Sequence, residues 1–275
     1  MNAGDVTAQA DAIGRKADAS GALDHAVRVG LVAYGLVHLI IGGIAVRLAF
    51  GDQSGSASGS GALSELAKTP FGGILLYVAA AGFASLVVWQ VIEMFTGHRE
   101  KDGKERLAKR LGSLFKTVLY GSLGWSAFKL ALGGGSDGGS TDTITAKIMA
   151  MPGGQVLVGL VGLGVLAYGS RLIYKGLSEG FTSKLDLNGS TGADGRAYVL
   201  LGKVGHVAKG LALFVVAGLF IWAAWTQDPE KSGGLDQALH QVLRQPFGMP
   251  MLLAMGLGIG CYGLFCFAWA RHLDR

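Results

Sequence analysis

An apolar segment of the chain begins with Thr69-Pro-Phe-Gly-Gly-Ile-Leu-Leu76 and continues to Phe95. A run of about 20 apolar residues is long enough to cross the hydrocarbon core of a bilayer as a helix. Backbone groups in hydrocarbon need internal hydrogen-bond partners, so the segment is a helix rather than a strand. Proline suits the first turn of a helix, where its missing N–H costs nothing. The segment therefore predicts a transmembrane helix that starts at a Pro-x-Gly motif.

The same motif occurs twice more, at Pro152-Gly153-Gly154 and at Pro246-Phe247-Gly248. The repeat extends well beyond the motif. A shift of 82 residues places Gly30 on Gly112 and Pro70-x-Gly72 on Pro152-x-Gly154, and Gly205 is the counterpart of Gly112 in a third copy. Internal repeats of this kind predict tandem structural units. Each unit is expected to be an ingoing helix, an outer loop, the Pro-x-Gly motif and a returning helix.

Reading the whole chain for apolar runs gives six expected membrane helices. They are Val29–Phe50, Phe71–Phe95, Leu111–Leu132, Gly154–Tyr174, Leu200–Trp225 and Phe247–Ala270. The expected organisation is an N-terminal cytosolic arm at 1–27, then units at 28–109, 110–197 and 198–275. Two spans per unit give every copy the same orientation. The expected fold is an all-α membrane protein with three parallel helical-hairpin repeats around a pseudo-threefold axis.

The composition agrees with a membrane protein. Half of the 275 residues are hydrophobic, only 16% are charged, and mean hydropathy is +0.42. An ordinary soluble domain has about 25% charged residues. These values exclude a nucleic-acid-binding module and a disulfide scaffold. The first 27 residues lack the short basic stretch, apolar core and cleavage site of a secretory signal, so a cleaved signal peptide is not expected.

Loop charges predict the orientation of the chain in the membrane. The N-terminal arm, the second and fourth connections and the C-terminus carry fourteen Lys and Arg residues, whereas the other three connections carry four. Positively charged loops stay in the cytosol. We therefore expect a multi-pass protein of the cell membrane with both termini in the cytosol. Three short amphipathic stretches, Ala62–Lys68, Thr143–Met149 and Leu235–Leu243, are expected to lie on the outer membrane face.

The threefold pattern of Gly-rich first helices and Pro-x-Gly motifs resembles a bacterial membrane protein family called domain of unknown function 1206. The resemblance covers about residues 25–270. It implies three tandem two-helix units and no assigned activity. The third copy departs from the pattern where Trp222 stands in place of the Arg47 and Lys129 of the first two units.

Equivalent positions in the first helix of each unit form the candidate polar cluster. One turn after the aligned glycines stand Tyr34, Lys116 and Lys209; another turn on are His38 and Tyr120 in the first two units. Residues four apart share a helix face, and small residues mark packed faces. Intramembrane ionisable residues are functional candidates, so Glu93, an acid within a span, joins the cluster.

Two interpretations of the cluster stay open. Lys116 and Lys209 either extend to the cytosolic headgroups as snorkelling side chains or point inward. The inward arrangement predicts a polar vestibule that opens to the cytosol, favours anions and is closed on the outer side by Leu39, Gly121 and Phe214. Arg171 and Lys175 are expected to form an ordinary solvated helix end.

No metal-ligand spacing or catalytic motif is found, so neither cofactor, metal nor enzymatic activity is expected. Cys261 and Cys266 are expected to be unpaired packing residues. The first functional hypothesis is a structural or accessory membrane component, with lipid, including anionic lipid, or other membrane proteins as partners. The alternative is a small-solute or anion pathway along the repeat axis. A haem-binding subunit using His38 and His206 is a weaker third class.

Overall fold

The computed structural model describes residues 21–96, 103–135, 141–186, 189 and 191–273. Within these residues six helices are long: α2 (Gly21–Ala49), α4 (Gly72–Thr96), α5 (Gly103–Ala131), α7 (Gly154–Leu177), α9 (Gly192–Thr226) and α11 (Gly248–Arg271). Shorter elements are α3 (Gly59–Ala67), α6 (Thr141–Met149), α10 (Leu235–Leu243) and the 3-10 turns η1 (Thr182–Lys184) and η2 (Pro229–Lys231). Across the described residues, β-structure is limited to one isolated bridge between Leu185 and Leu273.

Five of the long helices are long and apolar enough to cross a membrane: α2, α4, α7, α9 and α11. The sequence predicted six spans. Helix α5 has the length, but Lys116 and several serine and glycine residues reduce its hydropathy. Three helices begin well before the expected spans, because α2 starts at Gly21, α5 at Gly103 and α9 at Gly192. The last residues of the expected N-terminal arm are therefore helical, while residues 1–20 lie outside the described part.

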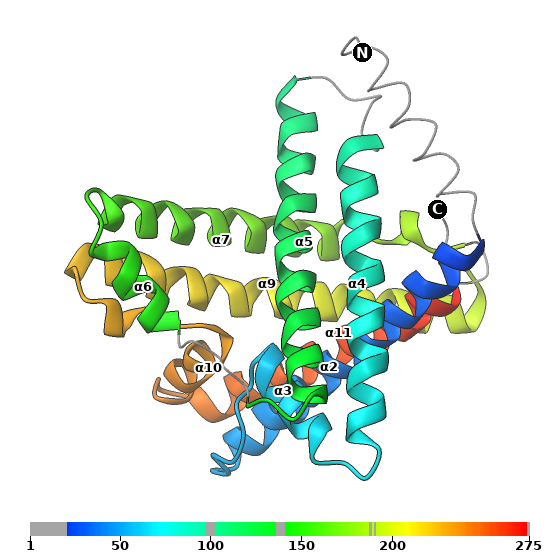
Figure 1. Ribbon diagram of the computed structural model, residues 1–275, viewed down its shortest axis with the longest axis horizontal. Coiled ribbons are helices and arrows are strands. Elements are labelled where there is room, and N and C mark those ends of the chain that lie inside the picture. The colour runs from blue at the N-terminus through cyan, green and yellow to red at the C-terminus, as the bar shows by residue number, and fades with distance from the viewer. Residues whose placement is uncertain (1–20, 97–102, 136–140, 187–188, 190, 274–275) are drawn as a thin grey trace.

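The long helices pack in the order α5, α4, α2, α11, α9, α7. The three most extensive contacts join α4 to α5, α7 to α9 and α11 to α2, so each joins neighbouring units or the last unit to the first. In Figure 1 α4 and α5 run upright, α7 and α9 run across the view, and α2 and α11 lie obliquely between them. The centre of the molecule is therefore the contact between the first and last long helices.

Glycines bring the central helices close together. A Cβ atom at Gly35 would lie 2.8 Å from the Gly263 carbonyl oxygen, and one at Gly42 would lie 2.7 Å from that of Gly256. Gly30 meets α4 in the same way, with the Gly82 oxygen 2.4 Å from its Cβ position. Small residues at these positions allow backbone-to-backbone packing. The interface between α2 and α11 is therefore filled by protein backbone.

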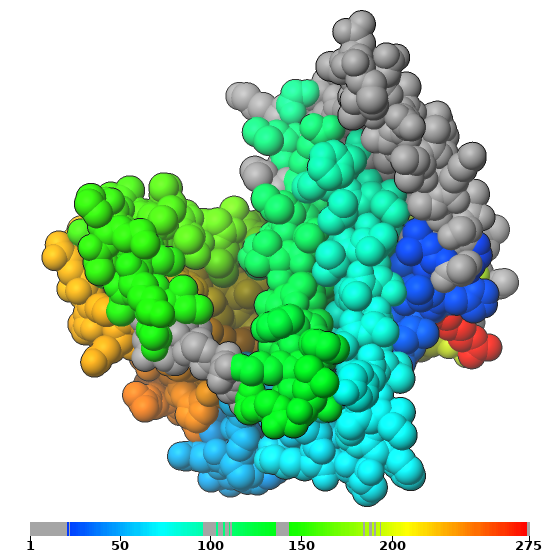
Figure 2. Space-filling view, in the orientation of Figure 1, coloured from blue at the N-terminus to red at the C-terminus, as the bar shows by residue number. Residues whose placement is uncertain are grey.

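The second unit does not make the internal contact of the other two. Helix α2 packs on α4 and α9 packs on α11, whereas α5 and α7 meet within the described residues mainly through side chains, such as the Phe115 and Tyr168 rings with centroids 4.7 Å apart. Gly112, the counterpart of Gly30, meets only the Arg171 side chain, and the equivalent Gly164 has no atom within 4 Å of its Cβ position. Figure 2 shows the surface hollowed between α5 and the lobe of α6 and α7. Threefold symmetry is thus not confirmed.

The Pro-x-Gly corners are alike in all three units. Helices α4, α7 and α11 begin at Gly72, Gly154 and Gly248, the glycines of the motif. Each glycine N–H donates to the carbonyl three residues earlier, at 2.9, 2.9 and 2.8 Å. The expectation that the proline occupies the first helical turn is wrong, since it lies in the preceding turn. The corner backbone therefore requires the glycine more than the proline.

The short helices α3, α6 and α10 coincide with the three expected amphipathic stretches. The apolar faces of α3 and α10 pack on the protein: Ala62, Leu63 and Leu66 of α3 are buried, and so are Leu239 and Val242 of α10. Helix α3 contacts α2, α4 and α5, while α10 contacts α9 and α11. These faces are therefore satisfied by the long helices rather than by lipid.

Candidate functional site: a basic pocket between α5 and α7

A cavity of about 410 Å³ occupies the gap where α5 and α7 fail to pack. All six long helices and the turn after α7 contribute to its wall. The lining residues are Tyr34, Glu93, Gly112, Ser113, Lys116, Tyr120, Tyr168, Arg171, Leu172, Lys175, Gly180, Ser183, His206, Tyr262 and Trp269. The pocket therefore exists because the second unit is open.

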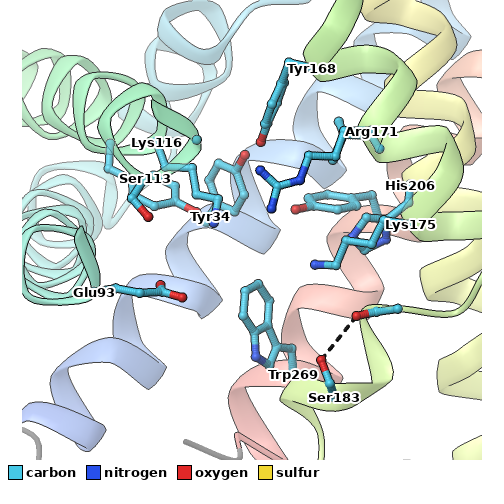
Figure 3. Close-up of a pocket in the computed structure, with 15 residues that line it drawn as sticks. Tyr34, Glu93, Ser113, Lys116, Tyr168, Arg171, Lys175, Ser183, His206 and Trp269 are labelled. Carbon is cyan, nitrogen blue, oxygen red and sulfur yellow. Dashed lines mark hydrogen bonds between the residues drawn. The ribbon is translucent and has the colours of Figure 1, made fainter. Parts of the chain in front are cut away.

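Cationic side chains reach the pocket from both sides. In Figure 3 Lys116 projects from α5, and Arg171 and Lys175 project toward it from α7. One turn of helix separates Arg171 from Lys175, so both lie on one face of α7. The Arg171 guanidinium extends over Gly112, where its Nη1 lies 2.7 Å from the Cβ position. A larger residue at Gly112 would therefore displace this cation.

Glu93 is the one carboxylate among the described residues of the lining. It comes from α4, near the end of the span, and Gln90 Nε2 donates to its Oε2 at 3.4 Å. Three cations and one carboxylate give the lining a formal charge of +2. An anion is therefore the ligand that complements the pocket.

Neutral donors complete the wall. Tyr34, Tyr120 and Tyr262 are buried, and the Tyr34 ring meets the Tyr120 ring edge-on at 5.1 Å. The Trp269 Nε1 atom is buried and has no hydrogen-bond partner within the described residues. Buried donors in proteins nearly always have a partner. The Trp269 indole N–H is thus a donor that an oxygen atom of a ligand could accept from.

A second polar group lies next to the Tyr34 hydroxyl, outside the residues that line the pocket. Lys209 of α9 has its Nζ 2.5 Å from the Tyr34 hydroxyl and 3.0 Å from His38 Nε2. The amine also lies 4.3 Å from the centre of the Tyr262 ring and 4.8 Å from that of Tyr34. These contacts hold the amine inside the protein, so the snorkelling interpretation is wrong for Lys209.

The structure brings the six residues of the candidate cluster into one region. Tyr34, Glu93, Lys116 and Tyr120 line the pocket, while His38 and Lys209 adjoin it through Tyr34. The expected apolar closure is wrong at Gly121, which is exposed on the outer side of α5. Leu39 and Phe214 instead pack against Gly263 and Gly169.

Several lining residues were not selected from the sequence. The sequence predicts Arg171 and Lys175 to be a solvated helix end, and it does not single out Tyr168, Tyr262 or Trp269. The available signal was their spacing: Tyr168, Arg171 and Lys175 recur every three or four residues and share one face of α7. What the sequence does not show is that this face borders an unfilled gap.

The histidines do not form a paired haem site. His38 Nδ1 is 2.8 Å from the Tyr34 carbonyl oxygen, and His206 Nδ1 is 2.7 Å from that of Gly202. The His206 ring stacks on Phe181 with centroids 4.9 Å apart. Within the described residues no group of three or more His, Cys, Asp or Glu side chains is placed to hold a metal ion. Cys261 and Cys266 are both free thiols.

Comparisons with known proteins agree with the repeat structure. The family model described as Domain of Unknown Function (DUF1206) matches three segments of the chain, 29–97, 111–179 and 204–272. An uncharacterized protein of Bacillus subtilis (strain 168) is 30% identical over 243 residues, which is 86% of each chain. No solved structure matches the chain. The three matched segments fall on the three units that share the Pro-x-Gly corner, and the chain is therefore a member of the DUF1206 family with three tandem copies of its repeat.

Proposed function

We propose that this protein binds a small oxyanion, a carboxylate or a phosphate, in the pocket between α5 and α7. The observation that carries the proposal is the convergence of Lys116, Arg171 and Lys175 on one cavity with a single described carboxylate, Glu93. Charge-assisted hydrogen bonds from Lys and Arg are the usual means of holding carboxylate and phosphate groups. The proposed role is binding and includes no chemical step on the ligand.

The proposal extends to the placement of the chain in the cell membrane. We take α5 as a sixth span, because its 29 residues are long enough and Lys116 faces the pocket instead of lipid. The asymmetry of loop charges then places both termini in the cytosol. The pocket includes Gly180 and Ser183 from the turn after α7, so it opens toward the cytosolic side.

A binding role agrees better with the geometry than an open channel does. The glycine contacts between α2 and α11 fill the centre of the molecule with backbone. The pocket lies beside that interface and is bounded by the buried rings of Tyr34, Tyr120 and Tyr262. An accessory role in the membrane is compatible with this design, with the anion as a bound component.

Binding of succinate and inorganic phosphate to the purified protein in detergent tests the proposal. We expect heat of binding by calorimetry and an increase in unfolding temperature, both abolished by Lys116→Met and by Arg171→Gln. Lys68→Met is the matched control, because Lys68 is an exposed cation that pairs with Glu65 far from the pocket. Absence of binding by both probes, or equal loss in the control, would reject a soluble anion ligand.

The same chemistry occurs in the headgroup of an anionic lipid, and a second measurement separates the two sources. Native mass spectrometry on protein from nanodiscs with and without phosphatidylglycerol reports retained lipid. Lipid retained by the parent protein and lost in Arg171→Gln would assign the pocket to a headgroup. Succinate binding with no retained lipid would assign it to a soluble anion.

A further inference from the structure

The amine of Lys209 is held by an arrangement that suits two protonation states. His38 Nδ1 lies 2.8 Å from the Tyr34 carbonyl oxygen, an acceptor, so Nδ1 carries the hydrogen and Nε2 is left as an acceptor. An ammonium group at Lys209 donates to His38 Nε2 and to the Tyr34 hydroxyl oxygen. A neutral amine still donates to His38 and accepts from the Tyr34 hydroxyl. The same positions of the Lys209, His38 and Tyr34 atoms therefore satisfy the hydrogen bonds of both the ammonium form and the neutral amine.

The surroundings of this amine supply no balancing negative charge. Within the described residues, Lys209 forms no ion pair with a carboxylate, and its contacts are the Tyr34 hydroxyl, His38 and the rings of Tyr34 and Tyr262. Opposite charges at close range stabilise a buried ion, and like charges oppose it. The charge that would stabilise the ammonium form must therefore come from a ligand.

The titratable groups that face Lys209 come from every neighbouring helix. They are Tyr34 and His38 of α2, Lys116 of α5, His206 of α9, and Tyr262 and Cys266 of α11, while Tyr120 of α5 and Tyr168 of α7 interact with Tyr34 and Tyr262. Lys116 is the other lysine in this set, and it lines the anion pocket together with Tyr34. An anion that neutralises Lys116 and Arg171 would also lie on the open side of the Tyr34 ring.

We propose that Lys209, Tyr34 and His38 form a proton-binding site coupled to the anion pocket, so that the protein takes up one proton together with its anion. This inference rests on the proposed function and names its second ligand. The proton resides on the Lys209 amine, hydrogen-bonded to His38 and Tyr34, and the anion lies across the Tyr34 ring among Lys116, Arg171 and Lys175. Coupling between two sites is reciprocal, so the proton must strengthen anion binding as the anion strengthens proton binding.

Calorimetric titration with succinate across pH tests the coupling. Succinate stays doubly ionised between about pH 7 and pH 10, so its own titration does not contribute. If one proton is taken up with each anion, the affinity for succinate should fall by about tenfold per pH unit at pH values above the pKa of the proton-binding site. Titrations in two buffers with different heats of ionisation count the protons directly.

Variants assign the proton to this site. In Lys209→Met and in the milder His38→Gln, we expect succinate to bind with no proton uptake or with altered pH dependence. Lys203→Met is the control, because Lys203 lies on the same helix but is exposed and pairs with Glu179. Lysine-selective NMR of the ligand-free protein reports the Lys209 amine independently of any anion, with Lys209→Arg identifying the signal.

The outcomes separate the two proposals. Succinate binding that is independent of pH, or proton uptake unchanged in Lys209→Met, overturns the coupling and leaves anion binding in place. A Lys209 signal that does not titrate between about pH 5 and pH 10 also overturns it, whatever the anion does. Failure of both succinate and phosphate to bind rejects the proposed function, and the coupling with it.

Discussion

At the scale of single residues, the Pro-x-Gly corners place the strictest demand on side-chain size. The Cβ position of Gly154 lies 1.8 Å from the Ile148 carbonyl oxygen, and the distances to the equivalent oxygens, Leu66 O at Gly72 and Val242 O at Gly248, are 2.6 and 2.5 Å. Contacts this short are with backbone, which cannot rotate away. Three equivalent corners thus depend on the absence of one methyl group.

Gly154→Ala is expected to lower the free energy of unfolding by about 1–3 kcal/mol or more, because the added methyl forces the corner apart. Gly73→Ala is the matched control, since Gly73 is also in the first turn of a long helix but has no atom within 4 Å of its Cβ position. Thermal unfolding in detergent measures both. Similar unfolding temperatures for the two variants would contradict the assignment.

Asp52, between α2 and α3, is expected to make the stability of the protein depend on pH. Hydrogen bonds from the side chain and backbone of Ser54, followed by the Arg47 guanidinium, lower the pKa of Asp52 to about 2. A carboxyl with a lowered folded pKa stabilises the protein above its ordinary pKa, and this contribution is lost as pH falls toward about 2. Asp52 is exposed, so the effect is small.

Asp52→Asn should therefore lower the unfolding temperature slightly at neutral pH. The difference from the parent protein should shrink between about pH 4 and pH 2, where Asp52 becomes protonated. Unfolding followed by circular dichroism over that pH range measures the difference. A constant difference at all pH values would show that the carboxylate charge is not responsible.

At the scale of elements, the short helices connect units that are distant in sequence. The Ala57 N–H, just before α3, donates to Asp236 Oδ1 of α10 at 2.6 Å, and Ala57 is completely buried. This bond joins the segment between α2 and α3 to α10 of the third unit. A buried N–H that loses its acceptor costs about 1–3 kcal/mol.

Asp236→Ala is accordingly expected to destabilise the protein by about 1–3 kcal/mol and to loosen α3 from α10. Glu230→Ala serves as the control, because Glu230 is an exposed acid in the same outer loop. Hydrogen exchange at Ala57, followed by mass spectrometry, should become faster only in Asp236→Ala. Unchanged protection would mean that another group holds the loop.

The elements were largely predictable, and their packing partners were not. Apolar runs and the Pro-x-Gly motif predicted the long helices, since both signals are local. These two signals do not predict that Gly112 and Gly164 stay apart, because a glycine-rich helix face does not specify which neighbouring helix packs against it. The polar residues of α2, α5 and α9 were identified by their repeat positions, whereas those of α7 became meaningful only with the gap beside them.

At the scale of the whole molecule, the proposed topology places the corners and the pocket at opposite membrane faces. Cysteines introduced at the exposed positions Gln53 and Gln227 should react with an impermeant maleimide in intact cells, because both lie in expected outer loops. Ser178→Cys, in the turn after α7, should react only after permeabilisation. The parent protein controls for Cys261 and Cys266, and the reverse pattern would invert the orientation.

The contact between α2 and α11 also affects the order in which the helices can assemble during synthesis. A ribosome delivers α2 first among the long helices and α11 last, yet these two pack together through Gly35, Gly42, Gly256 and Gly263. During synthesis the glycine face of α2 must wait for most of the chain to be made before its main partner arrives. Helix α4 can pack on α2 early, through Gly30 and Gly82, but the face of α2 that carries Gly35 and Gly42 has its main partner only after α11 is made.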